Sequence, residues 1–229
     1  MSAGQPALSP ELQLSALVRG AVGWDRVVVV LARDVDTRAA LRGSDTVLEH
    51  YCDLQQTLLQ GPSLDAFTSG TPVLVDDLRG PLPWSLLSAS TPADLPVRSL
   101  AVLPLLAPSS GVAPPDGPAR PVLGVLSAGR DRVEPFTPVQ VATLAHLAGV
   151  LSAVLVHRAS TGELVALDAD PSDDLAVVAG MLQERLGASG GEALSRMRAH
   201  AFTSGRTLNE LAQAVLAGHV AVDEVAGPL

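Results

Sequence analysis

LQQTLLQGPSLDAFTSGTPVLVDDL, residues 54–78, predicts three elements of a mixed fold. Apolar residues at helical spacing indicate a helix over 45–60, and Gly61-Pro62 ends it. Residues 63–70 follow as a short helix capped by a serine and ended by a glycine. Residues 71–78, TPVLVDDL, then form a strand. Helices and a strand in such close succession favour an α+β domain.

The segments on either side continue this alternation of strands and helices. The Pro- and Gly-rich stretch 109–121 must be a loop, and a strand on each side of it predicts an antiparallel pair. Pro104 lies in the first of these strands, so we expect an edge position or a bulge there. We expect strands at 27–32, 97–107 and 122–129, and helices at 10–20, 84–90 and 137–158.

The pattern changes to purely helical after an acidic stretch, STGELVALDADPSDD. We expect helices at about 172–187, 189–203 and 207–217, with breaks at Gly187, at Gly190-Gly191 and at Gly205. The sequence therefore predicts a mixed domain of strands and helices over 10–160, a linker over 161–171 and a helical domain over 172–229.

Composition excludes several classes of protein. The net charge is −9 and all 15 basic residues are arginine, so nucleic-acid binding would have to be local rather than a property of the whole surface. Cys52 is the only cysteine, which excludes an intramolecular disulfide, and Glu49, His50 and Cys52 do not have metal-ligand spacing. We expect no metal site and no cofactor.

The sequence shows neither a leader segment nor a membrane span. The residues before Val27 have no basic start and no apolar run, and the apolar stretches fall short of the roughly 18 residues that a span needs. No Gly-rich phosphate loop and no G-x-S-x-G motif occurs. We expect a cytoplasmic protein that is not an enzyme.

The ordered set LQQTLLQGPSLDAFTSGTPVLVDDL, VRSLAVLPL, VLGVLSAG and PFTPVQVATLAHLA resembles a GAF domain over about residues 10–158. The resemblance implies a central antiparallel sheet with helices on its faces and a small-molecule pocket under the short helices. The candidate pocket residues are Tyr51, Asp76 and Trp84. The alternatives are that Trp84 packs over the core and that Asp76-Asp77 only ends a strand.

The segments AGMLQERLG, EALSRMRAHA and GRTLNELAQAVLAG, residues 179–218, resemble the three helices of an ANTAR domain. ANTAR domains bind paired RNA hairpins and favour the antiterminator over the terminator. The resemblance implies a regulator in which a GAF sensor, responding to a small molecule or to a partner protein, controls an RNA-binding three-helix bundle. The family's lysine ahead of the glycine in the first helix is absent, because Val177, Val178 and Ala179 precede Gly180.

Four side chains in this region are candidates for RNA contact: Arg196, Arg198, His200 and Arg206. Leu194, Met197 and Ala201 have the spacing of core residues, and a guanidinium can bind phosphate or stack on unpaired bases. The alternative is that these arginines are solvated, with Glu192 and Arg196 forming an i,i+4 pair. The C-terminal bundle would then serve only protein interaction or dimerisation.

We expect a homodimer, because the helix over 137–158 is mostly apolar and one domain covers only one of its faces. Residues 172–229 contain four arginines against seven acidic residues. One copy should therefore bind RNA weakly, and two copies on paired hairpins would bind more tightly through effective concentration.

Overall fold

The computed structural model describes residues 24–32, 38–40, 45–108, 120–161 and 174–227. The predicted helix over 10–20, nearly all of the loop over 109–121 and the linker after residue 161 lie outside these ranges. The strands are β1 (Arg26–Ala32), β2 (Arg38–Ala40), β3 (Val73–Val75), β4 (Ser99–Leu106) and β5 (Val122–Arg130). The helices are α2 (Thr46–Leu58), α3 (Pro62–Ser69), α4 (Ser85–Ser90), α5 (Pro138–Ser160), α7 (Asp174–Leu186), α8 (Gly190–Thr203), α9 (Leu208–Leu216) and α10 (Val222–Ala226).

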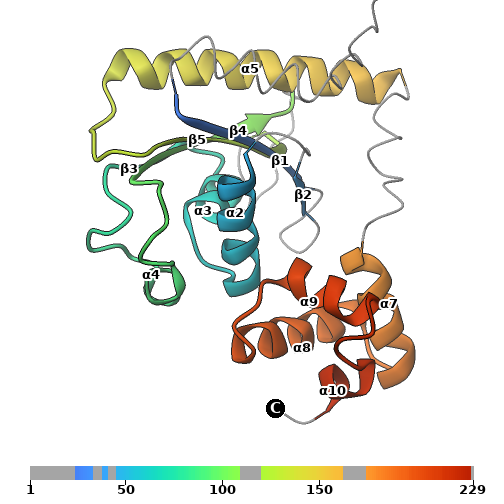
Figure 1. The fold of residues 1–229 in the computed structure, drawn as a ribbon. Helices are drawn as coiled ribbons and strands as arrows, with labels where there is room; N and C mark the ends of the chain where they lie inside the picture. Colours follow the sequence, from blue (N-terminus) through green and yellow to red (C-terminus); the bar gives the residue numbers. More distant parts are fainter. Residues whose placement is uncertain (1–23, 33–37, 41–44, 109–119, 162–173, 228–229) are drawn as a thin grey trace, which may run out of the picture.

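The five strands form one antiparallel sheet in the order β2-β1-β5-β4-β3. Helix α5 covers one face of the sheet, and α2, α3 and α4 lie on the other face (Figure 1). The predicted α+β class and the antiparallel pairing of β4 with β5 are confirmed. The sequence analysis missed β2, which has only three residues.

Alternating side chains of each strand enter two separate apolar clusters, as the two-residue period of a strand requires. Val28 and Val30 of β1 pack toward α2, α3 and α4, while Val27 and Val29 pack toward α5. Gly124 of β5 lies too close to β1 for a side chain, because a Cβ there would be 2.1 Å from the Val30 carbonyl oxygen.

Local signals set the ends of α2 and α3. Asp45 caps α2 by accepting hydrogen bonds from two backbone amides, and Leu59 ends the helix in the left-handed region. The prediction that Ser63 caps α3 is wrong. Gly61 is the N-cap and Pro62 takes the first helical position, where proline needs no amide hydrogen.

Pro104 lies where β4 is locally an edge of the sheet, and a bulge follows it. Strand β3 pairs with β4 only at Leu100, Ala101 and Val102, so Pro104 lies beyond the end of β3. A register shift follows between Leu105 and Leu106. The missing amide of proline therefore removes no hydrogen bond to β3.

Helix α5 begins as predicted, with a capping box between Thr137 and Gln140 and with Pro138 in the first helical position. The prediction that no apolar stretch reaches membrane-spanning length is wrong. Among the described residues, α5 alone is long and apolar enough by composition, with a mean hydropathy of 1.9 and 28% of that window buried. One face packs on the sheet through Leu144, Leu151 and Leu155, and the opposite face exposes Val139 and Val150.

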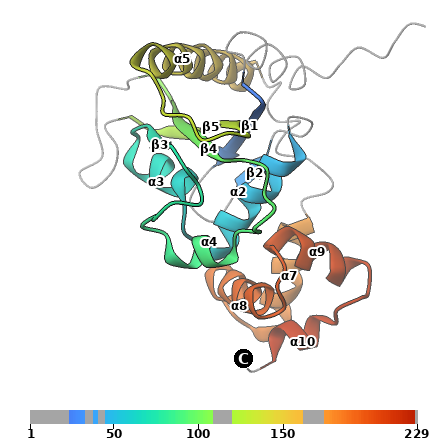
Figure 2. The ribbon, with the colours of Figure 1, turned by 60° about the vertical axis from the view of Figure 1, so that its left-hand side comes forward.

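Helices α7, α8, α9 and α10 form a bundle with its own apolar cluster, below the sheet domain in both views (Figures 1 and 2). Met197 and Ala201 are fully buried as predicted, and Leu194 is partly buried. Gly187 and Gly205 end α7 and α8 with φ of +63° and +67°. Gly190 and Gly191 do not break a helix. They form the first turn of α8, which Ser189 caps.

The bundle contains one helix more than the three that the sequence predicts. Helix α10 follows Val220, packs on α7 and α8, and contributes Val225 to the cluster. Two hydrogen bonds join the ends of its first turn: the Glu224 amide donates to the Ala221 carbonyl oxygen, and the Ala221 amide donates to the Glu224 carboxylate. The five-residue length of α10 explains why helical periodicity did not indicate it.

Candidate functional site

The three candidate pocket residues of the sheet domain do not line a common space. Tyr51 and Trp84 are buried members of the apolar cluster between the sheet and the short helices. Burial raises the pKa of the Tyr51 hydroxyl, which hydrogen-bonds Thr91. Asp76 is exposed after β3 and belongs to neither cluster. The region under the short helices is thus packed with side chains at these positions.

The indole of Trp84 has a structural partner. Its Nε1 donates a 3.0 Å hydrogen bond to Oδ2 of Asp65 in the first turn of α3. This bond joins α4 to α3 at the rim of the cluster and satisfies the one polar group of a buried indole.

We expect Trp84→Phe to lower the free energy of unfolding by about 2 kcal/mol or more, because the hydrogen bond to a carboxylate is lost and the smaller phenyl ring fills less of the buried site. Urea unfolding monitored by circular dichroism measures the change. Asp65→Asn is the matched control, since its amide oxygen can still accept from the indole and the loss should be smaller. Equal stability of Trp84→Phe and wild type would show that this bond contributes nothing.

Asp77, rather than Asp76, makes the polar contacts after β3. Its carboxylate accepts from the backbone amide of Arg79 and from the guanidinium of Arg98 at 3.0 Å. The backbone amide and then the guanidinium lower the pKa of Asp77. The pair joins the end of β3 to the start of β4, which agrees with the reading that Asp76-Asp77 ends a strand.

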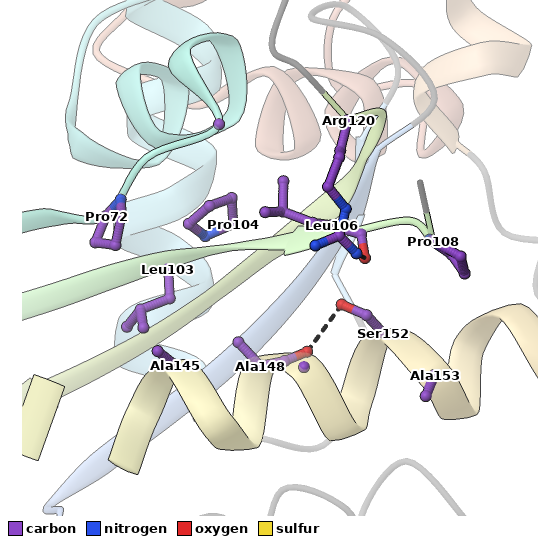
Figure 3. Close-up of a pocket in the computed structure, with 12 residues that line it drawn as sticks. Pro72, Leu103, Pro104, Leu106, Pro108, Arg120, Ala145, Ala148, Ser152 and Ala153 are labelled. Carbon is purple, nitrogen blue, oxygen red and sulfur yellow. Dashed lines mark hydrogen bonds between the residues drawn. The ribbon is translucent and has the colours of Figure 1, made fainter. Parts of the chain in front are cut away.

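A cavity of about 340 Å³ lies between the second half of β4 and the middle of α5 (Figure 3). Small residues of α5, including Ala145, Gly149 and Ser152, form one wall, and Leu103 and Pro104 form part of the other. The sequence analysis placed no site on this face. The small residues at helical spacing and the proline in β4 are the signals that could have indicated it.

Arg120 is the charged residue of the cavity lining. Its Nε and Nη2 donate to the carbonyl oxygens of Ala107 and Leu106 at 2.7 and 3.2 Å. No acidic residue is among the lining residues. A mostly apolar cavity with one guanidinium suits a small ligand that carries an anionic group.

Cys52 is buried, with its Sγ 3.9 Å from the Ser63 hydroxyl. Among the residues that the structure describes, no group of three His, Cys, Asp or Glu side chains could hold a metal ion. His50 instead approaches Glu210 of α9, at 3.7 Å between Nδ1 and Oε1.

The four candidate RNA-binding side chains differ in how many contacts they already make within the protein. Nη1 of Arg196 donates to the carbonyl oxygens of Ala226 and Gly227 at the end of α10, and Nη2 lies 3.6 Å from Glu192. The predicted i,i+4 pair therefore exists. Arg196 also satisfies the C-terminal carbonyls of a neighbouring helix, where a cation is favourable.

The other three candidates lie on α8, as Arg198 and His200 do, or directly after it, as Arg206 does. Arg198 is half-buried and donates from Nε to the carbonyl oxygen of Gln56, a residue of α2 in the sheet domain, at 3.4 Å. Arg206 is exposed, and no hydrogen bond or ion pair joins its side chain to the described part of the chain. His200 is half-buried near the end of α8. The structure thus leaves Arg206 as the accessible guanidinium of the set.

No protein-family model matches the chain, and no curated protein sequence matches it. Similar solved structures are sensor and GAF domains. A domain of a two-component sensor histidine kinase protein from Sinorhizobium meliloti 1021 is 17% identical with a TM-score of 0.49, covering 69% of this chain and 99% of that chain. The second GAF domain of DevS from Mycobacterium smegmatis is 17% identical with a TM-score of 0.40, covering 66% and 94%.

The GAF domain of an Acinetobacter phosphoenolpyruvate-protein phosphotransferase is 14% identical with a TM-score of 0.44, covering 66% of this chain and 82% of that chain. At these identities and TM-scores the similarity does not establish a family for the chain. What the chain itself displays is an α+β domain with an antiparallel sheet, joined to a helical bundle.

Proposed function

We propose that the chain is a cytoplasmic, signal-responsive regulator in which a GAF-type sensor domain controls an RNA-binding helical domain. The helical domain, of ANTAR type, binds paired RNA hairpins and promotes transcription antitermination. The observation that carries the proposal is the fit between the motif spacing in residues 179–218 and the bundle. The apolar positions of the motif, among them Met197 and Leu211, are its core, and Arg206 is exposed.

The sensor half of the proposal is supported by its sheet and its cavity. An antiparallel sheet with α5 on one face and short helices on the other is the arrangement that the GAF resemblance implied. The signal we propose is a small molecule with an apolar body and an anionic group, bound between β4 and α5 beside Arg120. The protein itself carries out no catalysis.

The active form is a homodimer in this proposal. The exposed face of α5 carries Val139 and Val150, 75% and 49% exposed, together with Ala142. Two such faces related by a two-fold axis would cover each other's apolar surface. Each protomer would then present one RNA-binding bundle, as paired hairpins require.

A second candidate function is that the bundle serves only protein interaction or dimerisation. Two of the four candidate side chains, Arg196 and Arg198, already hold protein carbonyl oxygens. In addition, α7 exposes Val177 and Met181, one helical turn apart. In this alternative the bundle has the ANTAR-type fold without RNA binding.

We expect Arg206→Ala to weaken binding to a tandem-hairpin RNA by about tenfold, or about 1.4 kcal/mol. In a plot of the logarithm of the binding constant against the logarithm of salt concentration, the slope should become shallower by about 0.7–0.9 if one phosphate contact disappears. A gel-shift titration at several salt concentrations measures both quantities. Arg132→Ala is the matched control, because it removes an exposed arginine of the sensor domain and changes net charge equally. If the wild type bound the tandem-hairpin RNA no more tightly than a scrambled RNA, the second candidate function would be favoured.

A further inference from the structure

The C-terminal third of α2 is polar yet buried. Gln55, Gln56 and Thr57 are 0%, 5% and 4% exposed, although three consecutive polar residues are typical of a solvated surface. Gln55 faces its own domain, where its Oε1 accepts from the Ser63 amide. Gln56 and Thr57 have partners in α8 and α9, which lie against this end of α2 in both views (Figures 1 and 2).

Thr57 completes the N-terminus of α9. The first amides of a helix have no partner within the helix, and the amide of Leu208, the first residue of α9, donates to Oγ1 of Thr57 at 2.8 Å in a buried hydrogen bond. The same hydroxyl donates to the carbonyl oxygen of Asp53 at 2.8 Å. The cap of α9 is therefore divided between Thr207 of its own domain and Thr57 of the sensor domain.

Arg198 completes the C-terminus of α2 in the same way. The last turn of α2 contains no basic residue, although the partial negative charge of a helix C-terminus favours one. The guanidinium of Arg198 provides that charge by donating to the Gln56 carbonyl oxygen. Each domain thus satisfies a helix end of the other.

Ionisable groups surround these two contacts. Asp53 on α2 hydrogen-bonds Asn209 of α9, with Glu49 and His50 on its own helix and Glu210 on α9 close by. Burial raises the pKa of Asp53 to about 6. The hydrogen bond with Asn209 and the interaction with His50 both lower this pKa, but by less. The closed contact consequently keeps half-buried an acid that is charged at neutral pH.

We propose that this contact between α2 and α8–α9 is an autoinhibitory one, in which the sensor domain and RNA compete for Arg198. In the closed state Arg198 holds the end of α2 and is withheld from RNA. In the open state the first turn of α9 and Arg198 are released together. The competition with RNA rests on the proposed function, whereas the closed–open equilibrium does not.

The pH dependence follows from the position of Asp53. The pKa of Asp53 is about 6 in the closed state and returns to about 3.9 in the open state. A proton therefore binds more tightly to the closed state, in which neutral Asp53 is easier to bury. The closed state is then favoured as pH falls. Linkage between these two values makes the closed-to-open ratio about tenfold higher at about pH 5 than at about pH 7.5.

Hydrogen exchange of the full chain and gel shifts with tandem-hairpin RNA test the proposal together. Thr57→Val removes the acceptor for the Leu208 amide, so exchange at the start of α9 should quicken several-fold and RNA affinity should rise by a similar factor. Asp53→Asn removes the buried charge, so exchange should slow, RNA affinity should fall, and the tenfold pH effect should disappear. Thr143→Val is the matched control, because Thr143 makes the same i−4 carbonyl bond in α5, away from the contact.

Each outcome decides part of the inference. Unchanged exchange at α9 in both variants would overturn the closed contact itself. Faster exchange in Thr57→Val without any gain in RNA affinity would overturn the competition for Arg198. If neither wild type nor Thr57→Val bound RNA, the proposed function would fail and the competition with it, while the exchange data would still support or overturn the closed contact.

Discussion

Gly124→Ala should destabilise the sheet domain by about 3 kcal/mol, because the centre of a packed sheet cannot admit another methyl group without moving a strand. The added Cβ would lie 2.1 Å from the Val30 carbonyl oxygen and 2.9 Å from the Leu31 Cα, and both are backbone atoms of β1. Separating β1 from β5 would disturb the ladder that joins Gly124 to Leu31. Urea unfolding followed by far-ultraviolet circular dichroism, which reports both domains, measures the loss.

Gly180→Ala is the control that separates steric from conformational effects. A Cβ at Gly180 meets nothing within 4 Å in α7, so alanine should stabilise the helix by about 1 kcal/mol through its better helix propensity. Opposite signs for the two substitutions would establish that Gly124 is required by the close approach of two strands. A Gly124→Ala protein as stable as the wild type would show that β1 and β5 can separate at little cost.

Val150→Arg should convert the proposed dimer into monomers and weaken binding to tandem hairpins by about 10²- to 10⁴-fold, because the gain from two linked binding sites is lost. The charge would lie in the middle of the exposed apolar face of α5. Sedimentation velocity gives the oligomeric state, and gel shifts with single and tandem hairpins give the affinities. Binding to a single hairpin should not change.

Val133→Arg provides the matched control for the dimer. Val133 is 49% exposed, as Val150 is, but it precedes α5. We expect this variant to remain dimeric with full affinity for tandem hairpins. A wild type that sediments as a monomer, or a Val150→Arg protein that stays a dimer, would contradict the use of this face.

The elements that the sequence predicted well are those whose signals are local. Thr137 and Pro138 mark the start of α5 because capping depends on residues three positions apart. Gly187 and Gly205 mark helix ends because a left-handed backbone favours glycine. Strands β4 and β5 were recognised from their own apolar residues and from the turn-rich loop between them.

What the sequence could not predict depends on residues that are distant along the chain. The polar run Gln55-Gln56-Thr57 is buried because α3 and the C-terminal bundle cover it from two sides. Arg198 meets Gln56 across 142 positions of sequence. Tyr51 and Trp84 were candidate ligand contacts by residue type, and only packing shows that they fill the core instead.

The distribution of aromatic side chains gives the two domains separate optical signals. Both tryptophans, Trp24 and Trp84, and the single tyrosine lie before residue 100, and residues 172–229 contain only Phe202 as an aromatic residue. Trp24 is buried, stacks on Phe136 at 5.3 Å and has the Arg130 guanidinium 4.2 Å from its ring. Intrinsic fluorescence will therefore follow the sheet domain alone, while far-ultraviolet dichroism is dominated by helices of both domains. A difference between the two melting curves would measure directly how strongly the domains unfold as one unit.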